Sequence, residues 1–308
     1  MSKKESVPVV PTAKGGSSAA KKRIAQQRAA QAAAAKAKER RRKVIVVVSA
    51  TIIVAIVAAG VLTIAGLTGG KNAASASSPA LPAQVVNDVA NVPQSALDQV
   101  GAGTVAAVPA TLSGPALTSG GKPQILYVGA EYCPYCAAER WPMAVALSRF
   151  GTLSNLGATA SSSTDVYPST QTLSFHGATY KSGSIDFVGK EIENTQEQPL
   201  DKLTSSEEAT FDKYDAPPYV PASGKGAIPF VDIGGRYLIS GVEYDPQLLQ
   251  GKSRTQIASA LSDPSSSIAQ AVDGTANVIT AAICKVDANA PAKVCTSAGV
   301  VAAAKKLT

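Results

Sequence analysis

Residues 124–141 read QILYVGAEYCPYCAAERW, and this stretch decides the fold. Its first part, 124–130, is mostly apolar and rich in β-forming side chains, which is typical of a buried central strand. Pro134 suits the first turn of a helix, where its missing N–H costs nothing, and the Ala, Glu and Arg that follow are good helix formers. The pattern therefore predicts a strand that runs directly into a C-x-x-C motif at the start of a helix.

The predicted place of the two cysteines indicates redox chemistry. A thiol becomes a nucleophile only as the thiolate, and the free N–H groups and positive dipole of a helix N-terminus favour that charge. Cys133 is therefore the expected nucleophile. Cys136 lies one turn further along, where its sulfur can attack a mixed disulfide on Cys133 and release the product. A strand, a C-x-x-C motif and a helix in this order are a stronger signal than the motif alone.

These residues resemble the thioredoxin superfamily, and CPYC at 133–136 has the same four letters as the glutaredoxin active site. The superfamily also carries a proline, usually in the cis form, that opens a strand beside the active site. Ile228-Pro229-Phe230 matches this mark in the expected order. The resemblance implies that Pro229 faces the cysteine pair and helps to hold a substrate chain.

A closer resemblance is to the family called domain of unknown function 929. It rests on YVGAEYCPYCAAERW at 127–141, LSRFG at 147–151 and IPFVD at 228–232, and it extends from about residue 85 to about residue 300. It strengthens the prediction of an α/β, thioredoxin-like domain with a central mixed sheet flanked by helices, and it implies no substrate. No glutathione-binding pattern follows Pro229, so the four shared letters do not indicate a glutathione enzyme. The redox-active disulfide of Cys133 and Cys136 is expected to act without a dissociable cofactor.

Further residues around the motif are candidates for tuning the thiols or lining a substrate groove: Glu131, Tyr132, Pro134, Tyr135, Glu139 and Trp141. The two glutamates either assist proton transfer from Cys136 or are solvated charges at a helix end. The aromatic side chains either pack in the core or contact substrate.

Two more cysteines, Cys284 and Cys295, follow the last predicted helix and are expected to form a structural disulfide in an oxidising compartment. Closing a loop of this size adds about 2–3 kcal/mol of stability. The alternative is that they relay electrons to Cys133 and Cys136.

Charge is distributed unevenly along the chain. Residues 1–43 hold 13 of the 29 Lys and Arg but two of the 22 acidic residues, so this tail carries +11 and the remainder −4. The basic residues stand directly before an apolar run, which explains them without nucleic acid. We therefore expect no nucleic-acid partner.

The apolar run, 44–67, has 24 uncharged residues. At about 1.5 Å per residue it is long enough to cross a hydrocarbon core of about 30 Å. The basic flank predicts a single-pass anchor in the cell membrane, with the N-terminus cytosolic, the C-terminal domain extracytoplasmic and the lipid bilayer as a partner. The alternative is a signal peptide cleaved after Ala76, although its apolar core is usually about 7–15 residues long.

The chain thus divides into four predicted parts. A basic tail covers 1–43, the transmembrane helix 44–67, a flexible Gly-, Ala- and Ser-rich linker 68–84, and the extracytoplasmic domain 85–308. Within the domain, 190–222 are predicted to be an insertion, and the periodic apolar residues after 267 indicate C-terminal helices.

The predicted function is a membrane-anchored thiol-disulfide oxidoreductase that acts on thiols or disulfides of secreted or envelope proteins, together with an unidentified membrane or extracytoplasmic electron partner. One rival is a metal-binding module, such as a copper-delivery protein, in which Cys133 and Cys136 hold a soft ion. His176, the only histidine, is expected to be a surface or packing residue, and we assign no metal site. The other rival is an interaction protein that uses the fold only to bind partners.

Overall fold

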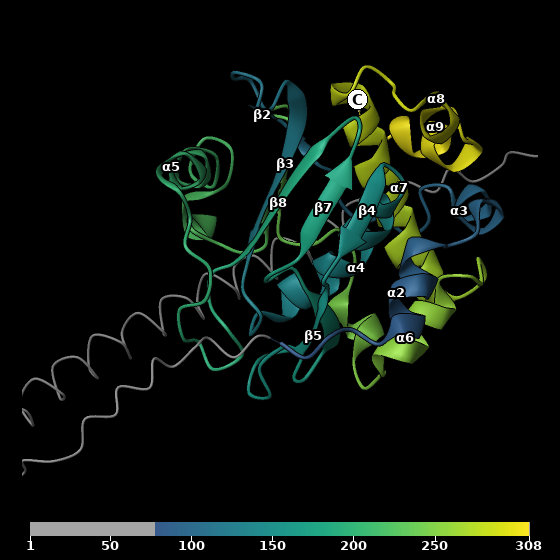
Figure 1. Ribbon diagram of the computed structural model, residues 1–308, viewed down its shortest axis with the longest axis horizontal. Helices are drawn as coiled ribbons and strands as arrows, with labels where there is room; N and C mark the ends of the chain where they lie inside the picture. The colour runs from purple at the N-terminus through teal and green to yellow at the C-terminus, as the bar shows by residue number, and fades with distance from the viewer. Residues whose placement is uncertain (1–77, 308) are drawn as a thin grey trace, which may run out of the picture.

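A computed structural model describes residues 78–307, which form a mixed α/β domain around a six-stranded sheet (Figure 1). At the centre of the sheet lies β3 (Lys122–Gly129), which pairs in parallel with β8 (Asp186–Glu191) and antiparallel with β9 (Phe230–Ile233). Beyond β9 follow β10 (Tyr237–Ser240) and β1 (Ala110–Thr111), and β2 (Thr118–Ser119) pairs with the start of β3. The sheet is therefore mixed, as predicted.

Both faces of β3 are covered because its side chains alternate between two cores. Ile125 and Tyr127 belong to the larger core, on the side of α4 (Pro134–Ser148) and α7 (Ser267–Val286). Leu126 and Val128 belong to a smaller core on the other side, which Phe211 of α5 (Ser205–Tyr214) helps to cover. A strand buried on both faces reads as a continuous apolar run, which explains the pattern at 124–130.

The hairpin of β9 and β10 closes through two glycines. Gly234 and Gly235 have φ values of 63° and 69°, a left-handed backbone that favours glycine. The backbone N–H of Gly235 also donates to the Asp232 carboxylate over 2.6 Å, which fixes the turn. The hairpin holds the strand that follows Pro229 at the centre of the sheet.

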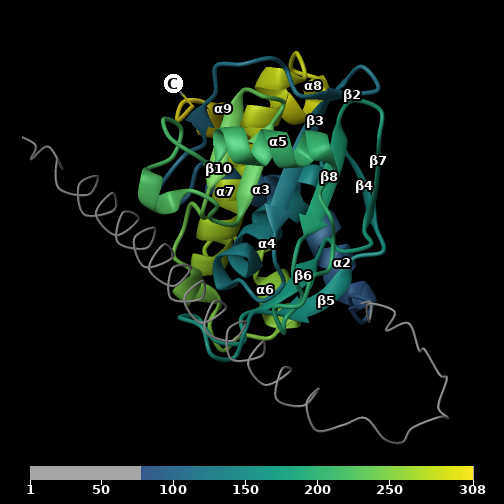
Figure 2. The same ribbon diagram turned by 90° about the vertical axis from the view of Figure 1, so that its left-hand side faces the viewer.

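Helices surround the larger core. The long α7 packs against α4 and α9 (Ala298–Ala304), and α2 (Ala83–Ala90) packs against α4 and α6 (Arg254–Ala260). The remaining helices are α3 (Gln94–Val100), α8 (Ala292–Cys295) and the 3-10 turns η1 (Ala222–Gly224) and η2 (Pro246–Leu249). Figure 1 shows α5 and α7 on opposite sides of β3 and β8, and in Figure 2 α5 lies in front of the sheet. As a result α4, which begins at the cysteine motif, is buried along its length.

Two small hairpins complete the domain. One joins β4 (Gly151–Ser154) to β7 (Thr179–Ser182), and the other joins β5 (Gly157–Ala160) to β6 (Gln171–Ser174). β6 lies against α4, so the loop between β5 and β6 is carried toward the start of that helix. The predicted insertion at 190–222 contains the end of β8 and all of α5.

The predicted fold class needs a correction. The structure confirms the central mixed sheet and its flanking helices. The predicted fold class, a thioredoxin-like domain preceded by a transmembrane helix, is wrong for the residues that the structure describes. Across 78–307 no helix is both long and apolar enough to cross a membrane. The longest, α7, carries Asp273 and Asn277 within its length. The predicted anchor at 44–67 and the tail at 1–43 lie outside the described residues.

Candidate functional site

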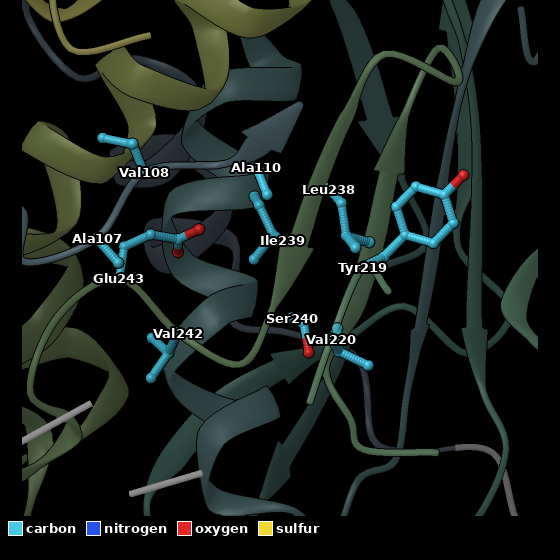
Figure 3. Close-up of a pocket in the computed structure, with 10 residues that line it drawn as sticks. All are labelled: Ala107, Val108, Ala110, Tyr219, Val220, Leu238, Ile239, Ser240, Val242 and Glu243. Carbon is cyan, nitrogen blue, oxygen red and sulfur yellow. The ribbon is translucent and has the colours of Figure 1, made fainter. Parts of the chain in front are cut away.

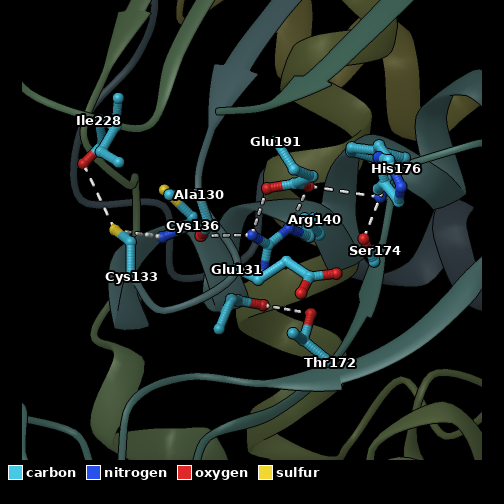
Figure 4. A network of polar contacts seen from close by, with 12 residues as sticks. Ala130, Glu131, Cys133, Cys136, Arg140, Thr172, Ser174, His176, Glu191 and Ile228 are labelled. Atoms are coloured by element: carbon cyan, nitrogen blue, oxygen red, sulfur yellow. Dashed lines mark hydrogen bonds and ion pairs between the residues drawn. The ribbon is translucent and has the colours of Figure 1, made fainter. Parts of the chain in front are cut away.

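The cysteine motif stands at the junction of β3 and α4, as the sequence predicts. Cys133 is the N-cap residue of α4, with extended backbone angles, and Pro134 follows in the first turn. The backbone N–H of Cys136 donates to Cys133 Sγ over 3.2 Å (Figure 4). An N-cap side chain normally accepts such a bond through oxygen, and here sulfur takes that place. The arrangement places the sulfur of Cys133 at the positive end of the helix dipole.

The two sulfurs differ in environment. Both cysteines are free thiols; Cys133 is 5% exposed and Cys136 is 0% exposed. Burial, and then the hydrogen bond and charge of Cys133, raise the pKa of the Cys136 thiol well above its ordinary value. Cys136 therefore stays protonated when Cys133 reacts, which suits it to the second step of an exchange rather than the first.

The loop that contains Pro229 reaches the cysteine motif through Ile228, the preceding residue. The Ile228–Pro229 peptide bond is cis. The thiol of Cys133 contacts the carbonyl oxygen of Ile228 at 3.6 Å, a distance within reach of a weak S–H donor (Figure 4). The Pro229 carbonyl accepts from the Gly241 N–H over 2.9 Å, which ties this loop to the end of the hairpin.

Two tyrosines flank Cys133. Tyr132 is half-buried and Tyr135 is buried, and burial raises the pKa of both phenols, so both remain neutral hydrogen-bonding groups. Tyr135 makes an edge-to-face contact with Tyr167 at 5.8 Å between ring centroids. The Tyr132 carbonyl accepts from the Ser162 N–H over 2.8 Å. Both tyrosines are thus contacted by the loop between β5 and β6.

The other flanking candidates point away from the thiols. Glu131 is buried and accepts a hydrogen bond from Ser78 Oγ over 2.5 Å. Trp141 is fully buried and its indole N–H donates to the Gln171 carbonyl over 3.3 Å, which makes it a packing residue between α4 and β6.

Glu139 belongs to a different cluster, because its carboxyl meets that of Glu243 in the interior. Glu139 is 0% exposed, and burial followed by the neighbouring Glu243 raises its pKa well above the ordinary 4.5. Glu243 also lines a cavity of about 50 Å³ beside β10 (Figure 3). The cavity has room for a few water molecules and is too small for an organic substrate.

Sequence reasoning missed a buried ion pair next to the motif. The Arg140 guanidinium donates from Nε to Glu191 Oε1 over 2.7 Å and from Nη2 to Glu191 Oε2 over 2.6 Å, and both side chains are 0% exposed. Arg140 Nη2 also donates to the Ala130 carbonyl over 2.6 Å (Figure 4). The available signal was a charged residue four positions after Cys136, on the side of a helix that should be buried.

Cys284 and Cys295 form a disulfide, as predicted. It links the last turn of α7 to the end of α8, with 5.7 Å between the two Cα atoms.

His176 is half-buried and its Nδ1 contacts the Asp201 carboxylate at 2.8 Å. Within 78–307, no group of three or more His, Cys, Asp or Glu side chains is arranged to hold a metal ion.

The fold and the site define a mixed α/β domain with a C-x-x-C motif at a helix N-terminus. The family model described as Domain of unknown function (DUF929) matches residues 109–285, more than half of the chain, and the chain belongs to this family. The matched segment contains Cys133, Cys136 and Pro229. No curated protein and no solved structure matches the chain.

Proposed function

We propose that this domain catalyses thiol–disulfide exchange with protein substrates through Cys133 and Cys136. The observation that carries the proposal is the placement of Cys133 Sγ at the N-cap of α4, where it accepts the Cys136 N–H. This position favours a thiolate that can attack, while the buried Cys136 is held back for the second step. The Ile228–Pro229 loop beside Cys133 adds backbone groups that a substrate chain can use.

Each turnover consists of two exchanges. First, the Cys133 thiolate attacks a substrate disulfide: a bond forms between Cys133 Sγ and one substrate sulfur, the substrate S–S bond breaks, and the other sulfur leaves with the electron pair and takes up a proton. Second, Cys136 gives up its proton to solvent and its thiolate attacks Cys133 Sγ. The internal disulfide closes, the mixed disulfide breaks, and the remaining substrate sulfur leaves with the electron pair and takes up a proton. Two electrons pass from the pair to the substrate, and the reverse sequence oxidises a substrate dithiol.

The disulfide of Cys284 and Cys295 supports an oxidising compartment as the place of action. The substrates we propose are therefore thiols or disulfides of secreted or envelope proteins. A second thiol or disulfide protein would restore the redox state of the pair after each turnover. The reduction potential of Cys133 and Cys136 decides which direction prevails.

Insulin, whose chains are joined by disulfides, is a suitable probe. The full chain with Cys136→Ala should form a dithiothreitol-sensitive adduct with an insulin chain, because no internal thiolate can release it. Cys133→Ala should form no adduct and should not reduce insulin. If the Cys133→Ala protein reduces insulin as fast as the unchanged protein, the proposal fails.

A further inference from the structure

The ion pair of Arg140 and Glu191 is fully buried, which is costly unless its geometry is good, and it lies next to the cysteine motif. Arg140 Nη1 is also buried, and among residues 78–307 it has no hydrogen-bond partner. Nε and Nη2 of Arg140 therefore donate hydrogen bonds, whereas the N–H groups of Nη1 do not.

The direction of the Arg140 side chain identifies that group. Side chains of an α-helix lean toward its N-terminus, so a residue lies over the one four positions earlier. For Arg140 that residue is Cys136. The bond from Arg140 Nη2 to the Ala130 carbonyl places the guanidinium at the N-terminal end of α4, because Ala130 precedes the motif. Figure 4 shows the guanidinium between Glu191 and the start of the helix.

We propose that Arg140 is a positioning residue for the second exchange: held by Glu191 and the Ala130 carbonyl, it places a positive charge next to Cys136 and stabilises the thiolate of that residue. The inference rests on the proposed function and deepens it. The bidentate contact with Glu191 fixes the planar guanidinium. Nη1 makes no hydrogen bond within residues 78–307, so Arg140 acts on the sulfur through its charge.

The charges acting on Cys136 agree with this geometry and give the test its sign. Cys136 faces Cys133 and Arg140 from its own helix, Glu191 from β8 and Tyr127 from β3. Arg140 lowers the pKa of the thiol, whereas Glu191 and the charge of Cys133 raise it. The Tyr127 phenol is fully buried and its pKa is raised, so it stays neutral. If Arg140 and Glu191 only packed the core, neutralising one and then the other would not shift the pKa of Cys136 in opposite directions.

The readout is the midpoint of ionisation of Cys136, followed through the NMR shift of its Cβ carbon in the full chain. Cys133→Ala is present throughout, so that Cys136 is the single free thiol. We expect Glu191→Gln, which keeps the arginine, to lower the midpoint. Adding Arg140→Met to Glu191→Gln should raise it by about one pH unit or more relative to Glu191→Gln alone. Arg140→Lys in the same background should recover part of the difference.

Arg149→Met is the matched control, because Arg149 is a half-buried arginine at the end of the same helix that contacts Asn277 over 2.9 Å. It should leave the midpoint unchanged. Equal midpoints with and without Arg140, or a rise on Glu191→Gln, would overturn the inference. Because Glu191→Gln is present in both Arg140 comparisons, removing Arg140 leaves no Glu191 carboxylate without its partner. If the insulin adduct of Cys136→Ala is absent while the midpoints shift as expected, the proposed function fails and the electrostatic role of Arg140 stands.

Discussion

The backbone N–H of Cys136 donates a hydrogen bond to the sulfur of Cys133 over 3.2 Å, so the two active-site candidates are connected in the dithiol state. The bond places the two residues in different roles. Cys133 accepts it at the N-terminus of α4, whereas burial and then the contact with Cys133 raise the pKa of the Cys136 thiol. The asymmetry of the pair is therefore built into the first turn of α4.

Cys133 should react before Cys136 with an alkylating reagent near neutral pH. The pKa of the Cys136 thiol is raised by its burial, so little thiolate is present there, and its sulfur is also less accessible. Peptide mapping after brief treatment with iodoacetamide should find the label at Cys133, in at least about tenfold excess. Label found first at Cys136 would reverse the assigned roles.

Glu139→Gln should make the protein more stable at alkaline pH. The pKa of Glu139 is raised in the folded state, so the folded protein binds this proton more tightly than the unfolded chain does. Its contribution is fully present below the ordinary value of 4.5 and is lost as pH rises toward the folded pKa. Each pH unit in that window removes up to about 1.4 kcal/mol.

Urea unfolding at several pH values measures this loss. As the pH rises above the ordinary value of 4.5, the unchanged protein should lose stability more steeply than the Glu139→Gln protein. Glu208→Gln, on the exposed side of α5, is the control and should leave the slope as it was. If the free energy of unfolding falls equally steeply with pH in the unchanged and Glu139→Gln proteins, the pKa of Glu139 is not raised in the folded state.

The centre of the fold was predictable because several local signals agree there. Residues 124–130 are apolar on both faces, Pro134 fits a first helical turn, and two glycines at 234–235 fit a tight hairpin. Each of these features depends on neighbours along the chain.

The missed parts of the site depend on contacts between distant segments. Arg140 meets Glu191, 51 positions later, only because β8 pairs in parallel with β3 and brings Glu191 opposite Gly129. Glu139 meets Glu243 because the chain after β10 returns to α4, where the Tyr244 hydroxyl donates to the Ala138 carbonyl. A single sequence gives the burial of such residues through periodicity, but it does not give their partners.

Tyr167→Ala should speed alkylation of Cys133. Cys133 is 5% exposed, and the neighbouring Tyr135 is held by an edge-to-face contact with Tyr167. Removing that ring frees Tyr135 and opens the approach to the sulfur, so we expect a severalfold faster reaction with iodoacetamide. The control is Tyr219→Ala, which removes a comparable contact with Tyr214 in the smaller core. An equal rate in the unchanged and Tyr167→Ala proteins would show that this loop does not limit access.

Replacing both Cys284 and Cys295 by Ala should weaken the fold and spare the chemistry. Their disulfide closes a short loop between α7 and α8, and its loss costs about 2–3 kcal/mol, or about 4–12 °C in melting temperature. Insulin reduction, measured well below the new melting temperature, should remain within about twofold. Cys133 and Cys136 lie at the start of α4, and their hydrogen bonds involve neither Cys284 nor Cys295. The unchanged protein treated with a mild reductant should show the same fall in stability, which separates loss of the bond from loss of the side chains. An unaltered melting temperature together with abolished insulin reduction would instead indicate that Cys284 and Cys295 carry electrons to the active pair.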